Sequence, residues 1–171
     1  MKNIIHLGLL TLLFFLVACH SENADQDATL PISDEMPNDF DFIVKFGITK
    51  KNEINTYENT ITKDLIANGT VTTNLILTDD EMAMIYKKMK EVNITETKQY
   101  VPKSSCSMEP YSEDEWIITL NDEIINHYIS EMYCEKTDDA KEMLELRDYV
   151  MFFVKSKEEY KSLPNAEGGY E

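Results

Sequence analysis

A stretch of ten residues, Asp39 to Ile48, constrains the fold of this chain more than any other part, because apolar and polar side chains alternate along it. A period of two residues is typical of a β-strand that buries one of its faces. The sequence therefore predicts a strand over residues 39–48 in a sheet with one buried face. The side chains expected on the buried face are Phe40, Phe42, Val44, Phe46 and Ile48, opposite Asp39, Asp41, Ile43 and Lys45.

Two more segments downstream continue the strand pattern. The first is a more polar strand expected over residues 54–65, and the second is TVTTNLIL, residues 70–77. Asn68 and Gly69 lie between them, and this dipeptide is a strong signal for a tight turn. The three strands together predict an antiparallel meander.

A β-hairpin is expected further along, in the segment WIITLNDEIINHYIS, residues 116–130. Asn121 and Asp122 suit a two-residue turn. With that turn, Trp116 would face His127 across the hairpin. A loop that contains two prolines leads into this segment.

The apolar spacing becomes helical in two places. Thr78 and Glu81 have the spacing of a capping box, so the first helix is expected over residues 79–92. A second helix is expected over residues 138–155, because apolar residues recur there at intervals of three and four. The expected buried residues are Met82, Ile85, Tyr86 and Met89 in the first helix and Met143, Leu146, Val150 and Phe153 in the second.

The first residues have the layout of an export signal, with Lys2 followed by an apolar run over residues 4–18. This run is shorter than the ~20 residues that a membrane-spanning helix needs. It ends in Leu-Val-Ala-Cys, residues 16–19, which resembles the lipobox of bacterial lipoproteins. The resemblance implies cleavage between Ala18 and Cys19 and acylation of Cys19, with palmitate among the attached chains. An ordinary secretory signal is the alternative.

The segment after Cys19 is polar, acidic and broken by Pro31 and Pro37, so it is expected to be a flexible tether. The predicted organisation is a signal peptide (1–18), an acylated cysteine and tether (19–38), one domain (39–163) and a loose tail (164–171). For the domain we expect an α+β fold, with an antiparallel sheet of about five strands, a meander plus a hairpin, packed against two helices. Its final segment and element order loosely resemble small lipoproteins of low-GC Gram-positive bacteria, a resemblance that implies no activity.

Charge restricts the partners. Cleavage after Ala18 would remove one of the 16 basic and none of the 32 acidic side chains, which changes the net charge from −16 to −17. A strongly acidic protein repels phosphate backbones, so nucleic acid is not expected as a partner, whereas a basic protein or a divalent cation is. Acidity that only keeps the domain soluble is the alternative.

Cys106 and Cys134 are the only other cysteines. In an exported domain an even pair favours a disulfide, with two free thiols as the alternative. No Cys-x-x-Cys motif indicates redox catalysis.

The sequence predicts no catalytic residue, cofactor or metal site. His127 is the one histidine in the expected domain, and its place in a strand favours a packed side chain. Three acidic clusters lack the alternating ligand spacing of a calcium loop. We interpret two of them as helix N-termini and the third as a solvated loop. The clusters are Asp79-Asp80-Glu81, Asp138-Asp139 and, for the loop, Glu113-Asp114-Glu115.

The functional hypothesis is a lipid-anchored protein on the extracytoplasmic side of the cell membrane. It would hold to the bilayer through acylated Cys19 and bind an envelope protein without catalysis. A basic protein is one version of this partner, and an inhibitor or immunity protein is one version of the role. The alternatives are an enzyme that uses His127 with carboxylates, and a module that binds a small ligand or calcium.

Overall fold

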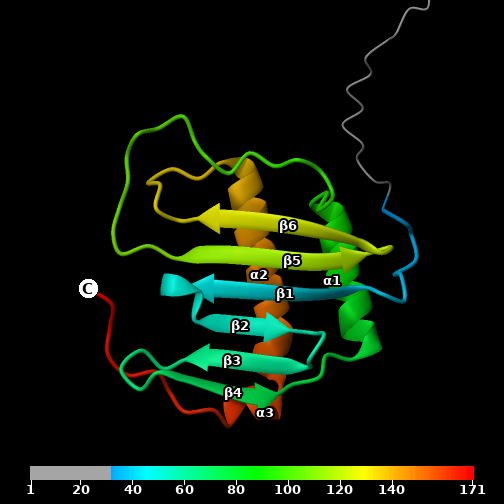
Figure 1. Cartoon of the computed structure of the whole chain (residues 1–171), viewed down its shortest axis with the longest axis horizontal. Helices are drawn as coiled ribbons and strands as arrows, with labels where there is room; N and C mark the ends of the chain where they lie inside the picture. Colours follow the sequence, from blue (N-terminus) through cyan, green and yellow to red (C-terminus); the bar gives the residue numbers. More distant parts are fainter. Residues whose placement is uncertain (1–31) are drawn as a thin grey trace, which may run out of the picture.

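The computed structural model describes residues 32–171 (Figure 1). The predictions for the signal peptide, for Ala18 and for Cys19 lie outside the described residues. So does most of the predicted tether.

Six antiparallel strands form one sheet in the order β4-β3-β2-β1-β5-β6. Strand β1, predicted from the alternating pattern, lies in the middle and pairs with β2 on one side and β5 on the other. Strands β4 and β6 are the two edges. The strands are β1 (Asp41–Gly47), β2 (Asn52–Asn55), β3 (Thr60–Asp64), β4 (Thr70–Asn74), β5 (Glu113–Leu120) and β6 (Glu123–Ser130).

Two long helices, α1 (Asp79–Glu91) and α2 (Asp138–Ser156), cross one face of this sheet. The predicted capping box is present: the Thr78 hydroxyl accepts from the Glu81 amide, and the Glu81 carboxylate accepts from the Thr78 amide. A 3-10 turn, η1 (Ile48–Lys50), and a short helix, α3 (Glu158–Lys161), complete the elements. Within residues 32–171, no helix is both long enough and apolar enough to cross a bilayer.

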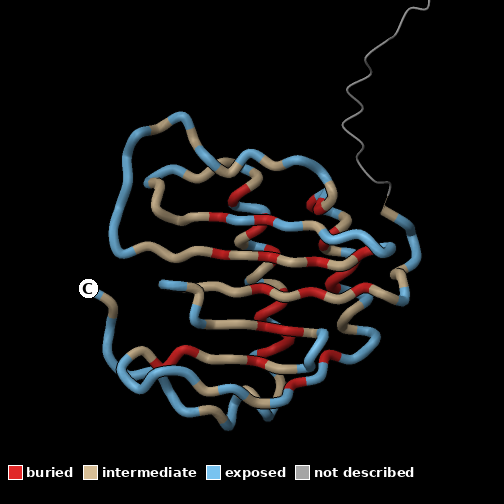
Figure 2. Tube along the Cα trace, viewed as in Figure 1, coloured by how far each residue is buried: buried red, intermediate tan, exposed pale blue. Residues whose placement is uncertain are grey.

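The core lies between the sheet and the two helices. Figure 2 shows buried positions alternating along the central strands. Phe42 and Val44 of β1 and Trp116 and Ile118 of β5 are all fully buried there. The opposite face of the sheet has no helix over it in the described part of the chain, so its side chains meet solvent.

The predicted α+β class is confirmed, but the sheet has six strands instead of five. The segment predicted as one strand over residues 54–65 is two, β2 and β3, joined by a turn. Asn59 has a left-handed backbone in this turn (φ 53°), and the Glu58 amide donates to the Asn55 side chain at 3.1 Å. Asparagine commonly adopts a left-handed backbone and commonly accepts a hydrogen bond from a nearby backbone amide. Asn55 and Asn59 were therefore the sequence signal for this turn, and the prediction did not use it.

Both ends of the described chain are more ordered than the sequence predicts. The tail is held on the β3–β4 turn, where the Glu167 amide donates to the Leu65 carbonyl at 3.2 Å. At the other end, Ile32 and Met36 pack on the core, and the Ser33 carbonyl accepts from the Tyr86 hydroxyl at 2.8 Å. The bounds of the tether (19–38) and of the tail (164–171) stay predictions, while these contacts tie Ser33, Met36 and Glu167 to the rest of the domain.

Candidate functional site

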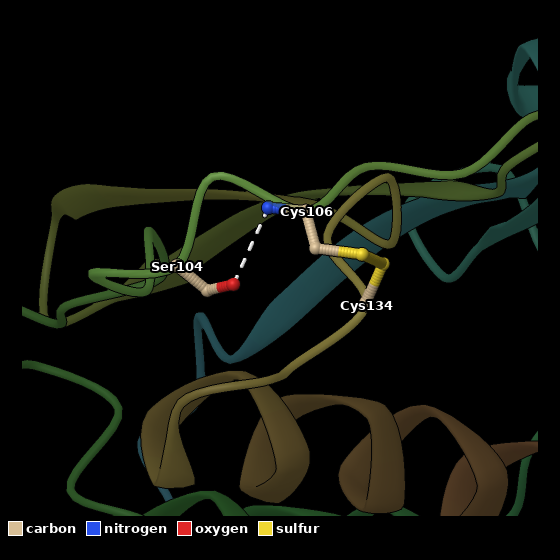
Figure 3. The surroundings of a disulfide bond; sticks show 3 residues. All are labelled: Ser104, Cys106 and Cys134. Carbon is tan, nitrogen blue, oxygen red and sulfur yellow. Dashed lines mark hydrogen bonds between the residues drawn. A yellow bond between two sulfur atoms is a disulfide. The ribbon is translucent and has the colours of Figure 1, made fainter.

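Cys106 and Cys134 form a disulfide (Figure 3), so the pairing predicted for these two cysteines is confirmed. Their Cα atoms are 5.5 Å apart, and the Cys134 amide donates to the Cys106 carbonyl at 3.2 Å. Beside them, the Met108 amide donates to the Met132 carbonyl at 2.7 Å. The bond joins the long loop before β5 to the segment that follows β6.

His127 of β6 is buried and engages both of its ring nitrogens. Nε2 lies 2.7 Å from the Ile94 carbonyl, so it must carry the proton and donate. Nδ1 lies 2.6 Å from the Tyr100 hydroxyl and, in the neutral ring, accepts from it. Burial lowers the pKa of His127, with a smaller lowering by Lys98, while the bond to Ile94 opposes them. Burial also raises the pKa of Tyr100.

These contacts bear on the enzyme hypothesis, which needed His127 beside a carboxylate or a thiol. The described residues form no such arrangement, because a phenol and a backbone carbonyl occupy the two nitrogens. A neutral histidine held in this way fixes the position of a loop, since it ties Ile94 and Tyr100 to β6.

The same loop is held from the helix side. The Lys98 ammonium lies 3.5 Å from Asp139 and 3.3 Å from Glu142 of α2, with only 4% of its side chain exposed. The Gln99 amide donates to Asp139 at 2.7 Å. Residues 94–112 are therefore fixed near Tyr100 and again, through the disulfide, at Cys106.

Two cavities separate this fixed loop from β6, with volumes of about 340 Å³ and 180 Å³. They share Tyr100 and Tyr128 and therefore lie next to each other beside the strand, and we call the two together the β6 groove. Tyr128 donates to Glu113, and this bond, with burial, raises the pKa of Tyr128 to about 12. The side chains that line it include Glu96, Lys98, Tyr111, Glu113, Met132 and Tyr133.

One acidic cluster is placed differently from its prediction. Glu113-Asp114-Glu115 begins β5 instead of lying in a solvated loop, and Asp114 is fully buried. Asp114 accepts a hydrogen bond from Arg147 of α2 at 2.8 Å, and Glu131 lies 3.5 Å from the same nitrogen. Burial raises the pKa of Asp114 to about 6 against the opposing effect of Arg147.

The other two clusters lie at the N-termini of α1 and α2, as predicted. Thr137 caps α2, where its hydroxyl accepts from the Ala140 amide at 3.1 Å. Among residues 32–171, no group of three or more histidine, cysteine or acidic side chains is arranged to hold a metal ion.

A third and larger cavity, of about 610 Å³, opens at the end of the sheet where α1 begins. We call it the acidic cavity. Its floor is core, formed by Phe40, Ile54, Leu75 and Leu77. Asp41 and Asp79 stand in its wall, and no lysine or arginine lines it. Asn38, Asn59 and Thr60 add further polar groups.

Sequence reasoning missed Tyr100, Arg147 and the acidic cavity. Arg147 could have been suspected, because it is the only arginine of the chain and lies next to the buried stripe of its helix. Tyr100 lies in a loop without periodicity and had no signal. The cavity is built from three segments far apart in the sequence, so no local pattern could reveal it.

Comparisons with known proteins leave the function to be argued from these sites. No family model, no curated protein and no solved structure matches the chain. The fold class alone does not specify an activity, because one architecture supports many functions.

Proposed function

We propose that this protein is a lipid-anchored, non-catalytic binding module of the cell envelope and that its partner is a basic protein. The anchor would be Cys19, acylated after cleavage behind Ala18, which the lipobox-like Leu-Val-Ala-Cys supports. The domain would then be presented on the extracytoplasmic side of the membrane.

The acidic cavity is the observation that carries the binding proposal. Asp41 and Asp79 form no salt bridge with any of residues 32–171, so their carboxylates are available to a ligand. The apolar floor beneath them suits the hydrocarbon part of a lysine or arginine side chain, and the carboxylates suit its charged end.

The charge of the whole chain supports the same partner. A net charge of −16 attracts basic proteins over a distance set by screening and speeds their association. The same field disfavours nucleic acid, as the sequence predicts.

Site-specific photo-crosslinking in cells tests the binding proposal. A photoreactive residue would replace Ile76, which lines the acidic cavity and is 65% exposed. The matched control is Phe152 on the outer side of α2, also apolar and 68% exposed. We expect one basic protein to crosslink at position 76, to be missing at position 152, and to be lost when Asp41→Asn and Asp79→Asn are combined. Identical products at both positions, or none at good yield, would contradict the proposal.

Mass spectrometry of the membrane fraction tests the anchor separately. We expect a chain that begins at Cys19 with the added mass of acyl groups, and we expect Cys19→Ser to abolish processing. An uncleaved chain, or Cys19 without acyl mass, would show that the anchor is wrong while leaving the binding proposal intact.

A further inference from the structure

The hydrogen-bond phase of the β5–β6 hairpin decides which groups of β6 face outward. Asn121 and Asp122 both have positive φ, 53° and 62°, the signature of a type I′ turn, so Leu120 and Glu123 form a hydrogen-bonded pair. The Glu131 amide, which donates to the Ser112 carbonyl at 2.8 Å, shows the same phase at the far end. In an antiparallel pair, alternate residues bond inward and outward. The backbone groups of four residues therefore point away from β5: Ile124, Asn126, Tyr128 and Ser130.

These outward groups have no backbone partner. Strand β6 is an edge of the sheet, and among residues 32–171 no backbone–backbone hydrogen bond reaches the four residues from outside the hairpin. Ile124 is 66% exposed and Tyr128 is 49% exposed, so solvent reaches these two residues of the edge strand. A row of N–H and C=O groups without backbone partners at a sheet edge is a template for another strand.

The other edge of the sheet provides a comparison. Bonds from the Leu65 amide to the Gly69 carbonyl and from the Leu75 amide to the Asn59 carbonyl, both 2.8 Å, set the phase of β4. Asn74 therefore points its amide outward, as Asn126 does on β6. No residue of β4 lines the β6 groove or the acidic cavity. Strands β4 and β6 thus both have outward backbone groups without backbone partners, but only β6 has the β6 groove beside it.

The wall of the β6 groove is preorganised. In Figure 1 the loop between α1 and β5 passes outside β6. His127 and Lys98 fix its first part and the disulfide its second, so little of its mobility remains to be lost when a ligand enters. A preorganised wall lowers the entropic cost of binding.

The side chains of the groove select a basic ligand. Glu96 and Glu113 line it and Glu123 lies at the start of β6, and none of the three has an ion-pair partner in the described part of the chain. Lys98, the only basic residue in the lining, is neutralised by α2. Tyrosine rings favour cations as well, and the Lys50 ammonium already lies 5.2 Å from the ring centre of Tyr128.

We propose that the outer edge of β6 accepts an extended, lysine- or arginine-bearing segment of a partner protein as a seventh strand of the sheet. The outward backbone groups would bind its main chain, and the tyrosines and carboxylates its side chains. A second copy of this chain fits the edge less well, because it brings the same net charge of −16. The proposal does not rest on the acidic cavity, which lies at a different edge of the fold.

A fluorescent ten-residue peptide, in which lysine alternates with valine or threonine, is the probe, and its anisotropy with the full-length protein is the readout. We expect saturable binding that Asn126→Pro weakens at least tenfold, because proline removes an outward donor and leaves the bonds to β5 intact. Asn74→Pro, which makes the same change on β4, should leave the affinity unchanged. The tenfold loss caused by Asn126→Pro should be the same in an Asp41→Asn background, which separates this test from that of the proposed function.

A second measurement leaves the protein unaltered. The peptide is N-methylated on alternate residues, either on one set of backbone amides or on the other, and only one set should abolish binding, since a strand pairs along one edge. Equal loss with both sets, equal affinity of Asn126→Pro and wild type, or no binding of the peptide at all would overturn the proposal. If a peptide with glutamate in place of lysine bound with equal affinity, the claim that the ligand is basic would be wrong. If the protein formed a dimer and Asn126→Pro dissociated it, the strand added to β6 would belong to a second copy of this chain, and the proposed basic partner would be wrong.

Discussion

Asn in place of Asp114 should change how the stability of this protein depends on pH. Asp114 is fully buried; one of its oxygens accepts from Arg147 at 2.8 Å, and the other has no hydrogen-bond partner in the described structure. Burial raises its pKa to about 6 from the ordinary 3.8, and the nearby carboxylates of Glu131 and Asp148 add to that effect. Arg147 opposes the change without cancelling it.

The sign of the effect follows from proton binding. Between pH 3.8 and about 6 the folded protein holds a proton on Asp114 that the unfolded chain has released. The free energy of unfolding therefore falls as the pH rises, by about 1.4 kcal/mol per pH unit and ~3 kcal/mol over the whole window. Of this amount, ~2 kcal/mol falls between about pH 4.5 and pH 7.5. An asparagine amide does not titrate, so the variant lacks this dependence.

Urea unfolding at a series of pH values measures the difference directly, with the fluorescence of the only tryptophan, Trp116, as the signal. Groups that titrate in both proteins cancel in the difference between wild type and Asp114→Asn. We expect wild type to lose about 2 kcal/mol relative to the variant as the pH rises across that range. Asp148→Asn is the control, because Asp148 touches the same arginine at 3.3 Å but is 73% exposed, and the stability difference between wild type and this variant should change much less over the same pH range. If the stability of wild type relative to Asp114→Asn did not change with pH, the reasoning would be refuted. If it increased with pH, Arg147 would outweigh burial in setting the pKa of Asp114.

Three further changes test the parts that hold the fold and the loop. Reducing the disulfide, whose cysteines are 28 residues apart, should lower the free energy of unfolding by roughly 3.5 kcal/mol in the chain-entropy model, and a loss in urea unfolding below about 1 kcal/mol would contradict this. Thr78→Ala should cost about 1 kcal/mol, because it removes the cap of α1, while Thr78→Ser, which keeps the hydroxyl, should cost little. Tyr100→Phe should cost about 1–3 kcal/mol, because it leaves Nδ1 of His127 without a donor, and NMR titration should show a higher pKa for His127.

The elements that the sequence predicts correctly are those with a long, regular period. Strand β1 and helices α1 and α2 begin within two residues of their predicted starts, because each buries a continuous stripe that the alternation or the helical spacing reveals. The hairpin was also predicted correctly, including the pairing of Trp116 with His127. The missed boundary between β2 and β3 has neither glycine nor proline, and its turn depends on two asparagines.

The position of Asp114 shows a different kind of error. A run of three acids indicates a solvated loop when only composition is considered. The phase of the strand gives the opposite answer, since Asp114 is in register with Trp116, Ile118 and Leu120, all of which are buried. A carboxylate on the buried face of a strand needs a cationic partner, and the chain has one arginine with which to supply it. At this end of β5 the alternation of the strand, and not the acidic composition of the segment, predicts correctly that Asp114 is buried.

The β6 groove combines a feature that the sequence contains with one that it does not. The two-residue turn at Asn121-Asp122 fixes which backbone groups of β6 face away from β5, and that follows from the sequence. Whether those groups meet solvent depends on strand order, and β6 is an edge because β5 is its only neighbour in the six-stranded sheet of the described residues. The disulfide then connects the groove to the proposed location, because one wall is held by a bond that persists in oxidising compartments and is rare in reducing ones. A lipid anchor on the outer side of the membrane would therefore place the β6 groove in a compartment where the disulfide that holds its wall persists.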